Sequence, residues 1–380
     1  MSWEVSKILE GENANDLFGE NVAIYGNYAI VGAYNYDKPG EPVTDNRGKV
    51  YWYERQRSRE WKLIHSVEGE TANDQFGRSV AIYGNYAIVG ATGFDGDGVS
   101  DTGKVYWYER QRSGEWKLIH SVEGENALDT LGGSVAIYGN YAIVSARFFN
   151  GSAGDDTGKV YWYERQRSGE WKLIHSVEGE NGSDKLGDSV AIYGNYAIVS
   201  ASNFNGRGVS DTGKVYWYER QRSGEWKLIH SVEGENADDY FGVSVAIYGN
   251  YAIVGAYLFD TDSRGKVYWY ERQRSGEWKL IHSVQGENNV DYFGRSVAIY
   301  GNYAIVGATG GNYVKFYQRK NNGKWEEIAK KVTPLTTGSD DFGDSVSIYE
   351  NYAMVGGGQG GPGGGEGVAV IYQRDNNFWD

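Results

Sequence analysis

The segment from Phe76 to Ala91 recurs with small changes from one end of the chain to the other. Each of its seven copies begins with Phe-Gly or Leu-Gly and ends with Val-Gly-Ala or a close variant. The initial glycines are Gly19, Gly77, Gly132, Gly187, Gly242, Gly294 and Gly343. A period of roughly 55 residues is typical of a repeat array, in which each unit buries its apolar faces against its neighbours. The copies leave no stretch for a second fold, so we expect residues 1–380 to form one domain.

One repeat predicts four β-strands. Residues 80–83 and 86–89 are rich in β-forming side chains and are separated by Gly84-Asn85, a pair that suits a two-residue hairpin turn. A loop of variable length leads to residues 104–109, and a short turn then leads to 116–122. We name these strands A to D. Seven repeats of four antiparallel strands, without a helical pattern, predict an all-β fold, a seven-bladed β-propeller.

The two ends of the chain fit a closed ring. Residues 3–10 align without gaps on residues 61–68, so the chain begins with a strand D, whereas its last repeat contains strands A, B and C. We therefore expect the N-terminal strand to complete the last blade, which leaves no open blade face. In such a ring both faces of each blade are covered. The alternating Tyr106, Trp107 and Tyr108 of strand C are then core residues rather than a sugar-stacking platform.

Composition excludes several classes of function. The net charge of −14 argues against a nucleic-acid partner, because phosphate backbones are bound by an excess of Lys and Arg. The absence of cysteine excludes disulfides and thiolate metal sites. We expect no signal peptide in this sequence and no membrane span, because no apolar run reaches the required length. We expect a monomer.

The repeats resemble the FG-GAP repeat, the blade unit of integrin α-chain propellers and of many bacterial proteins. The resemblance is carried by Phe18-Gly19, Phe76-Gly77, Phe241-Gly242, Phe293-Gly294 and Phe342-Gly343, with Leu-Gly at 131–132 and 186–187. A strand C ending in Tyr-x-Tyr-Glu-Arg is most similar to the bacterial subtype. The resemblance implies the fold and an extracellular or cell-surface location. The calcium loop of integrin-type repeats is replaced here by the Gly84-Asn85 turn, so that calcium site is not implied.

Strand direction predicts two different rims. Loops D–A and B–C emerge on one face, and loops A–B and C–D on the other. The first face is the more acidic in sequence, and its B–C loops differ in length and content while strands C and D stay almost constant in repeats one to five. A constant frame with diverse loops is typical of a recognition surface, although exposed loops also diverge without selection for binding.

Five B–C loops hold an aromatic residue followed by Asp or Asn. These pairs are Tyr36-Asp37, Phe94-Asp95, Phe149-Asn150, Phe204-Asn205 and Phe259-Asp260. An aromatic ring beside a carboxylate or amide can stack on a sugar and bind its hydroxyls, which predicts ligand-binding residues and up to five lectin-like pockets. The alternative is structural: the ring anchors the loop and the Asp or Asn closes a turn.

Other polar residues give weaker signals. Asp95, Asp97 and Asp101 lie close together in one loop and are a candidate calcium site, since Ca²⁺ takes six to eight oxygen ligands. An Asp three residues before each repeat glycine is interpreted as an acceptor of backbone N–H bonds. The five histidines occupy one strand D position in different blades and cannot converge, so we predict no catalytic residues.

The sequence therefore favours a non-enzymatic recognition or adhesion module, with a protein or carbohydrate ligand on the D–A/B–C face. Three alternatives stay open: a multivalent lectin with one pocket per blade, a passive repeat scaffold, and a propeller hydrolase or lyase with a central acidic site. Ca²⁺ is the only cofactor that the loops suggest.

Overall fold

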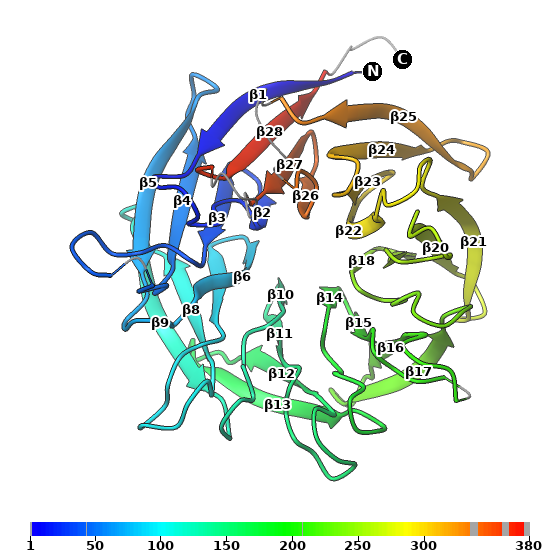
Figure 1. Ribbon diagram of the computed structural model, residues 1–380, viewed down its shortest axis with the longest axis horizontal. Coiled ribbons are helices and arrows are strands. Elements are labelled where there is room, and N and C mark those ends of the chain that lie inside the picture. Colours follow the sequence, from blue (N-terminus) through cyan, green and yellow to red (C-terminus); the bar gives the residue numbers. More distant parts are fainter. Residues whose placement is uncertain (1, 43, 207, 335–340, 359–364, 376–380) are drawn as a thin grey trace.

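The computed structural model describes residues 2–42, 44–206, 208–334, 341–358 and 365–375. Seven four-stranded antiparallel sheets stand around a central axis as the blades of a propeller (Figure 1). The predicted fold class is confirmed. Within the described ranges no helix is long and apolar enough to cross a membrane.

Each blade runs from strand A at the axis to strand D at the outer rim. The A strands are β2 (Asn21–Tyr25), β6 (Phe76–Tyr83), β10 (Val135–Tyr138), β14 (Val190–Tyr193), β18 (Val245–Tyr248), β22 (Phe293–Tyr300) and β26 (Ser345–Tyr349). The B strands are β3 (Tyr28–Ala33), β7 (Tyr86–Ala91), β11 (Tyr141–Ala146), β15 (Tyr196–Ala201), β19 (Tyr251–Ala256), β23 (Tyr303–Ala308) and β27 (Tyr352–Gly357). Blades are numbered 1 to 7 in this order.

The outer half of each blade is the C–D hairpin. The C strands are β4 (Lys49–Arg55), β8 (Lys104–Arg110), β12 (Lys159–Arg165), β16 (Lys214–Arg220), β20 (Lys266–Arg272), β24 (Tyr313–Arg319) and β28 (Val368–Arg374). The D strands are β5 (Trp61–Glu68), β9 (Trp116–Glu123), β13 (Trp171–Glu178), β17 (Trp226–Glu233), β21 (Trp278–Gln285), β25 (Trp325–Val332) and, for blade 7, β1 (Trp3–Glu10).

The A–B hairpins turn where the sequence predicts. The turn glycine of blade 2, Gly84, has a φ of +60°, a conformation that glycine adopts without strain. Five other blades also place a glycine there, and blade 7 places Glu350 there with a φ of +52°. The turn geometry is therefore the same in all seven blades although one of them lacks the glycine.

The cores lie between blades, as the alternation in strand C predicts. Tyr106 and Tyr108 belong to the cluster shared with blade 1, whereas Trp107 belongs to the cluster shared with blade 3. Trp107 is fully buried, with its ring centroid 5.3 Å from that of Tyr163 in the next blade. The Tyr-Trp-Tyr runs of blades 1 to 5 are thus interior and are not available for stacking on a ligand.

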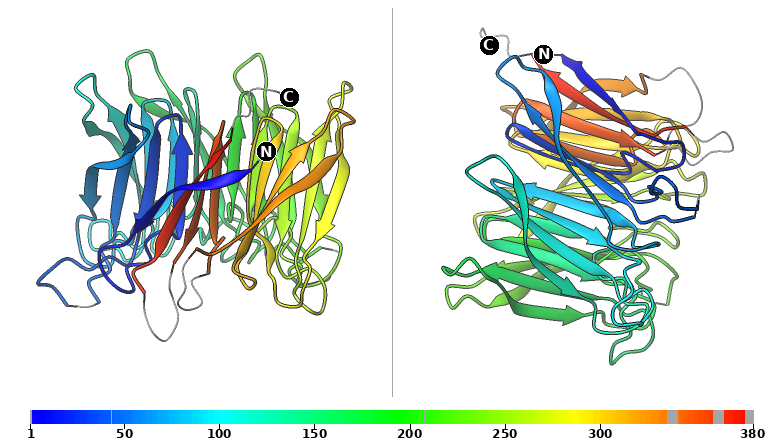
Figure 2. Two further views of the ribbon diagram at one scale, coloured as in Figure 1. Left: turned by 90° about the horizontal axis from the view of Figure 1, so that it is seen from above. Right: turned by 90° about the vertical axis from the view of Figure 1, so that its left-hand side faces the viewer.

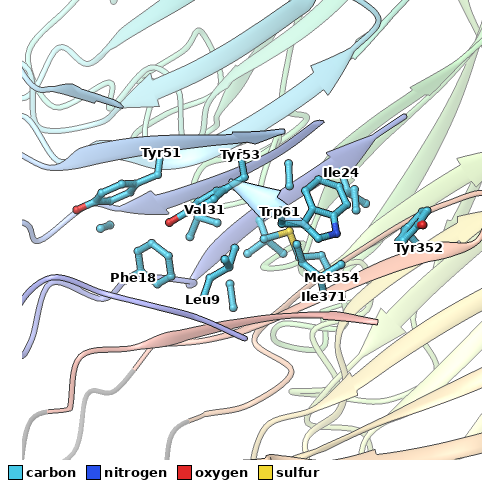
Figure 3. Close-up of a cluster of buried hydrophobic side chains, with 14 of the residues drawn as sticks. Leu9, Phe18, Ile24, Val31, Tyr51, Tyr53, Trp61, Tyr352, Met354 and Ile371 are labelled. Atoms are coloured by element: carbon cyan, nitrogen blue, oxygen red, sulfur yellow. The ribbon is translucent and has the colours of Figure 1, made fainter. Parts of the chain in front are cut away.

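The ring closes through β1. Trp3 pairs with Arg374 in the same register as Trp61 with Arg55 of blade 1, so β1 takes the strand D position of blade 7. Figure 1 shows β1 beside β28. The core between blades 7 and 1 joins side chains from both ends of the chain, including Leu9, Tyr51 and Ile371 (Figure 3). Closure of the ring therefore buries apolar surface in the same way as the contacts between other neighbouring blades.

The connections gather at two rims. Seen edge-on, the strands stand between a face that carries the D–A and B–C loops and a face that carries the shorter A–B and C–D turns (Figure 2). The first of these is called the loop face below. It surrounds the end of the axis where the A strands begin.

Candidate functional site

The aromatic rings of the five aromatic–Asx pairs lie beneath the loop face, whereas Asp95, Asn150 and Asn205 are exposed on it. The aromatic rings of Tyr36, Phe94, Phe149 and Phe204 are at most 8% exposed, and Phe259 is half-buried. A lysine from the start of strand C lies over each ring. The Nζ-to-centroid distances are 4.5 Å for Lys49 and Tyr36, 4.2 Å for Lys104 and Phe94, 4.4 Å for Lys159 and Phe149, 4.5 Å for Lys214 and Phe204, and 4.3 Å for Lys266 and Phe259.

The Asp or Asn of each pair closes its loop by accepting a backbone N–H bond. The donors are Asn46 to Asp37 (2.8 Å), Asp101 to Asp95 (2.8 Å), Asp156 to Asn150 (2.8 Å), Asp211 to Asn205 (2.9 Å) and Asp262 to Asp260 (2.9 Å). A sugar could reach the aromatic rings only if the lysines moved aside. This placement supports the structural interpretation of the pairs.

The structure also locates the candidate calcium residues. Asp95 and Asp101 lie near enough that the charge of Asp95, after burial, raises the pKa of Asp101. In the described part of the chain, however, no group of three or more His, Asp or Glu side chains could hold a metal ion, and Asp95, Asp97 and Asp101 form no such group. Two carboxylates alone supply too few oxygens for Ca²⁺.

The aspartates before the repeat glycines are structural, as predicted. Asp129 is fully buried and accepts the backbone N–H of Asn126 at 2.8 Å. The same contact occurs in other blades, for example from Asn181 to Asp184 at 2.8 Å. The seventh member of the set, Asp340, lies outside the described residues.

A cavity of about 400 Å³ opens on the axis at the loop face. We call it the axial mouth. Two positions of each repeat contribute half of its lining residues: the residue after Phe-Gly or Leu-Gly, and the first residue after strand B. The first set includes Glu20, Arg78, Gly133, Asp188, Val243, Arg295 and Asp344, and the second includes Arg147, Ser202 and Tyr257. Blades that are distant in sequence thus meet at one site.

The mouth residues that follow Phe-Gly or Leu-Gly and strand B differ between repeats, whereas Ser244, Ser296 and Ser345 occupy a position that is nearly constant. Strands C and D of repeats one to five are almost identical, yet the position after Phe-Gly holds acidic, basic, apolar and glycine residues in turn. The opposite end of the same A strands holds tyrosine in all seven blades. Exposure alone does not explain this contrast, because both ends of the strands face solvent at the axis.

A third position combines variable side chains with an unfavourable backbone. The residue before Phe-Gly or Leu-Gly has a positive φ in every copy. The residues are Leu17 (+55°), Gln75 (+53°), Thr130 (+51°), Lys185 (+52°), Tyr240 (+51°), Tyr292 (+52°) and Asp341 (+47°). Such a conformation costs a non-glycine residue about 1–2 kcal/mol. The chain uses glycine freely elsewhere but never here. Lys185 and Tyr240 line the axial mouth.

Ion pairs between neighbouring blades surround the mouth. An Arg78 nitrogen lies 3.6 Å from Glu20, Arg147 lies 3.1 Å from Asp188, and Arg295 lies 3.0 Å from Asp344. The lining contains four cations (these arginines and Lys185) and three anions, so its net charge is +1. The axis therefore does not carry the central acidic site that is expected of the hydrolase or lyase alternative.

The acidic residues of the D–A loops lie further out and are partly neutralised. In blade 2, Lys104 at the start of strand C lies 3.1 Å from Glu70 and 3.4 Å from Glu123. The equivalent Lys159 of blade 3 lies 3.1 Å from Glu125. The net negative charge of the loop face therefore lies around the axial mouth, whereas the lining of the mouth has a net charge of +1.

Burial and neighbouring charge perturb one carboxyl group of the mouth, that of Glu20. Burial raises the pKa of Glu20, and the nearby Asp344 raises it further, while Tyr34, Arg78 and Arg295 oppose the shift. Arg78 also lies over the ring of Tyr34, with its guanidinium carbon 4.5 Å from the centroid. Perturbed carboxyl groups in a cavity are typical of functional sites.

Comparison with known proteins identifies the repeat. A family model described as "FG-GAP repeat" matches residues 4–53, 64–108, 231–270 and 285–323. This chain is a seven-bladed β-propeller of FG-GAP repeats. No curated protein matches the sequence.

Two solved structures share the fold of this FG-GAP propeller. A protein from Lactobacillus plantarum is 14% identical, with a TM-score of 0.53 over 83% of this chain and 85% of that chain. Virginiamycin B lyase from Staphylococcus aureus is 8% identical, with a TM-score of 0.54 over 97% of this chain and 99% of that chain. At such identities the similarity concerns the fold alone.

The other end of the axis in the FG-GAP propeller is built differently. A second cavity, of about 280 Å³, is lined by the A strands and ends at seven tyrosines. Consecutive centroids are 4.3–4.7 Å apart around the whole ring: Tyr25, Tyr83, Tyr138, Tyr193, Tyr248, Tyr300 and Tyr349. Sevenfold repetition of one side chain suits packing around the axis rather than discrimination between ligands.

The residues of the axial mouth are not among those predicted from the sequence. Their signal is the divergence of the residue after Phe-Gly, within copies that are otherwise almost constant. That divergence has no functional meaning until the A strands are placed around one axis.

Proposed function

We propose that this FG-GAP propeller is a non-enzymatic recognition module that binds a protein or glycan at the axial mouth of the loop face. One observation carries the proposal: the residue after Phe-Gly or Leu-Gly lines the mouth in all seven blades and varies among them, while the strands of the blades are nearly identical. A ligand bound on the axis meets a different residue from each blade. Selection for such a ligand diversifies these positions and leaves the frame unchanged.

The mouth has the composition of a small binding site. Its volume lies within the range of ordinary ligand pockets, and charged, hydroxyl and aromatic groups converge on it from several blades. A multivalent lectin would instead use the five aromatic–Asx pairs, and a passive scaffold would need no diversified axial positions. The experiment below distinguishes the proposed function from both alternatives.

The test is a binding screen of the whole chain against arrays of glycans and of extracellular proteins, with calcium and with chelator. The site variant replaces Arg78 and Arg295 by Val, the residue that blade 5 holds at the same position as Val243. The control variant replaces Arg112 and Arg167, exposed residues of the C–D turns on the opposite face, by Val. Both variants remove two positive charges.

We expect a ligand that binds the wild type and the control variant and is lost from the site variant. Binding that survives in the site variant places recognition elsewhere. Binding that is lost instead on replacing Phe94, Phe149 and Phe204 with Ala, in protein that remains folded, favours the lectin alternative. Failure of every probe to bind leaves the passive scaffold.

The hydrolase or lyase alternative has one observation in its favour. Glu20 has a raised pKa and lies near a second carboxylate, Asp344, a pairing that can divide acid and base roles between two groups. If a ligand found in the screen is cleaved on incubation, and Glu20→Gln stops the cleavage without abolishing binding, the module is an enzyme.

A further inference from the structure

One side of the axial mouth carries positive charge that the protein does not neutralise. Arg147 and Lys185 lie against the same ring, Phe148, with the guanidinium carbon 4.7 Å and Nζ 5.2 Å from its centroid. Arg147 has an ion pair with Asp188, whereas Lys185 has no ion-pair partner among the described residues. Of the two cations on the boundary of blades 3 and 4, therefore, only Arg147 is paired with a carboxylate.

Asp188 is already occupied by other contacts. It accepts the ion pair from Arg147 at 3.1 Å and a hydrogen bond from the Ser202 hydroxyl. A carboxylate used in this way does not reach across to balance Lys185. Lys185 is therefore left without an anionic partner beside Arg147. A guanidinium next to an ammonium is well suited to bind the carboxylate of a ligand.

The wall on the next blade, blade 5, is aromatic. The rings of Tyr240 and Tyr257 lie with centroids 5.8 Å apart. The Arg295 guanidinium covers the Tyr257 ring, with its carbon 5.4 Å from the centroid. Tyr240 donates its hydroxyl to Asp211 at 3.3 Å, so its ring is held in place. A fixed, partly buried aromatic ring offers an apolar face to a ligand whose other side is polar.

Hydroxyl and amide groups complete the lining. They come from Asn21, Ser202, Asn203, Ser244, Ser296 and Ser345. An apolar face, a set of hydrogen-bonding groups and one anion are the features of an acidic sugar. A cavity of about 400 Å³ accepts an end group of a glycan, whereas a specific protein interface spreads over about 800 Å² per partner.

Resting on the proposed function, we infer that the axial mouth binds the terminal residue of an acidic glycan. The carboxylate pairs with Lys185 and Arg147, and the sugar ring extends toward Tyr240. The Ser244 and Ser345 hydroxyls, which accept backbone N–H bonds, keep their own hydrogens for the neutral hydroxyls of the ligand.

The repeats themselves supply conservative variants for the test. Lys185→Gln copies Gln75, which has the same backbone conformation in blade 2. Arg147→Thr copies Thr92 at the equivalent position of blade 2. Lys172→Gln makes the same charge change on an exposed position of β13, away from the axis, and serves as the control.

The experiment is a glycan array of uronic-acid-terminated and sialic-acid-terminated glycans, each beside its neutral counterpart, with a hexaglutamate peptide as a further probe. Isothermal titration calorimetry of the best glycan follows, with wild type and the three variants. We expect preference for acidic over neutral glycans. Lys185→Gln and Arg147→Thr should each weaken binding about tenfold or more, because a charge-assisted hydrogen bond is lost, and Lys172→Gln should leave it unchanged.

Three results overturn the inference. Neutral glycans that bind as well as acidic ones show that no anion is required. Affinity for acidic glycans that is unchanged in Lys185→Gln and Arg147→Thr places the anion elsewhere. If only the hexaglutamate peptide or only a protein binds, and no glycan does, the ligand belongs to a different class. In the first and third cases, the proposed recognition function still holds if the double variant Arg78→Val, Arg295→Val loses binding of the ligand that was found. Failure of the acidic-glycan inference is therefore distinguishable from failure of the proposed function.

Discussion

The rings of Trp3 and Phe316 are stacked, with centroids 4.6 Å apart and planes inclined by 20°. Trp3 lies on β1 of blade 7 and Phe316 on β24 of blade 6. The internal blades make the corresponding contact between two tryptophans, as in Trp107 and Trp171 at 6.0 Å. The N-terminal strand thus reproduces between blades 6 and 7 the aromatic contact that joins the neighbouring blades from 1 to 6.

Replacing Trp3 with Ala should destabilise the ring. Trp3 is fully buried, and truncation of such a side chain typically costs about 3–5 kcal/mol. We expect a lower midpoint of unfolding in urea. Val5→Ala on the same strand is the control, because Val5 is 48% exposed and its truncation should change the midpoint little. Equal effects of the two variants would show that β1 contributes pairing but not packing.

Phe148 and Phe149 are adjacent in sequence and should have opposite roles. Phe149 is 6% exposed in the core between blades 2 and 3, so Phe149→Ala should lower stability by about 3–5 kcal/mol. Phe148 lines the axial mouth, and Phe148→Asn copies Asn203 of the next blade. We expect this second variant to keep its unfolding midpoint and to lose affinity for the ligand found in the screen. Unchanged ligand binding by Phe148→Asn would contradict the axial site.

Protonation of Asp16 should contribute stability as the pH falls from 7 to about 4. Burial raises the pKa of Asp16 to about 6, against opposing hydrogen bonds from Asn13, while the unfolded chain titrates near 3.8. A raised pKa favours the protonated folded form, so this contribution is complete below 3.8 and is lost as the pH rises through about 6. The expected contribution is about 2–3 kcal/mol.

The check is the thermal midpoint between pH 4 and 7 for wild type and Asp16→Asn. The variant does not titrate at this position and should show a shallower dependence on pH. Parallel curves would mean that Asp16 has an ordinary pKa and that the change comes from other groups. Below this window the trend should reverse, because Glu287, paired with Lys315 and Lys330, has a pKa lowered to about 2 and loses its stabilisation on protonation.

Glu350→Gly should stabilise the protein. Glu350 has a φ of +52° where six other blades place glycine. Relief of the left-handed conformation, about 1–2 kcal/mol, exceeds the added entropy of the unfolded chain, about 0.4–1 kcal/mol. We expect a gain of about 0.5–1 kcal/mol, measured as the midpoint of urea unfolding. The reverse change in another blade, Gly139→Glu, should lower stability by a similar amount. If both variants destabilise, the side chain of Glu350 has a stabilising contact that outweighs its backbone cost.

The repeat pattern alone determined the blades, their strands and the ring closure. Alternation within strand C assigned Tyr106 and Trp107 to opposite interfaces, and the match of residues 3–10 to residues 61–68 placed the N-terminal strand in the last blade. These features are local or repeated, and hydrogen bonding and apolar burial within one repeat are sufficient to specify them.

The axial mouth was decided only by tertiary structure. Arg78 and Glu20, or Arg295 and Asp344, are brought together because closure of the ring places equivalent positions of neighbouring blades around one axis. Likewise, only the packing of the B–C loop shows that Phe149 is buried while Phe148 lines the cavity. No spacing within a repeat encodes these contacts, since each depends on the rotation from one blade to the next.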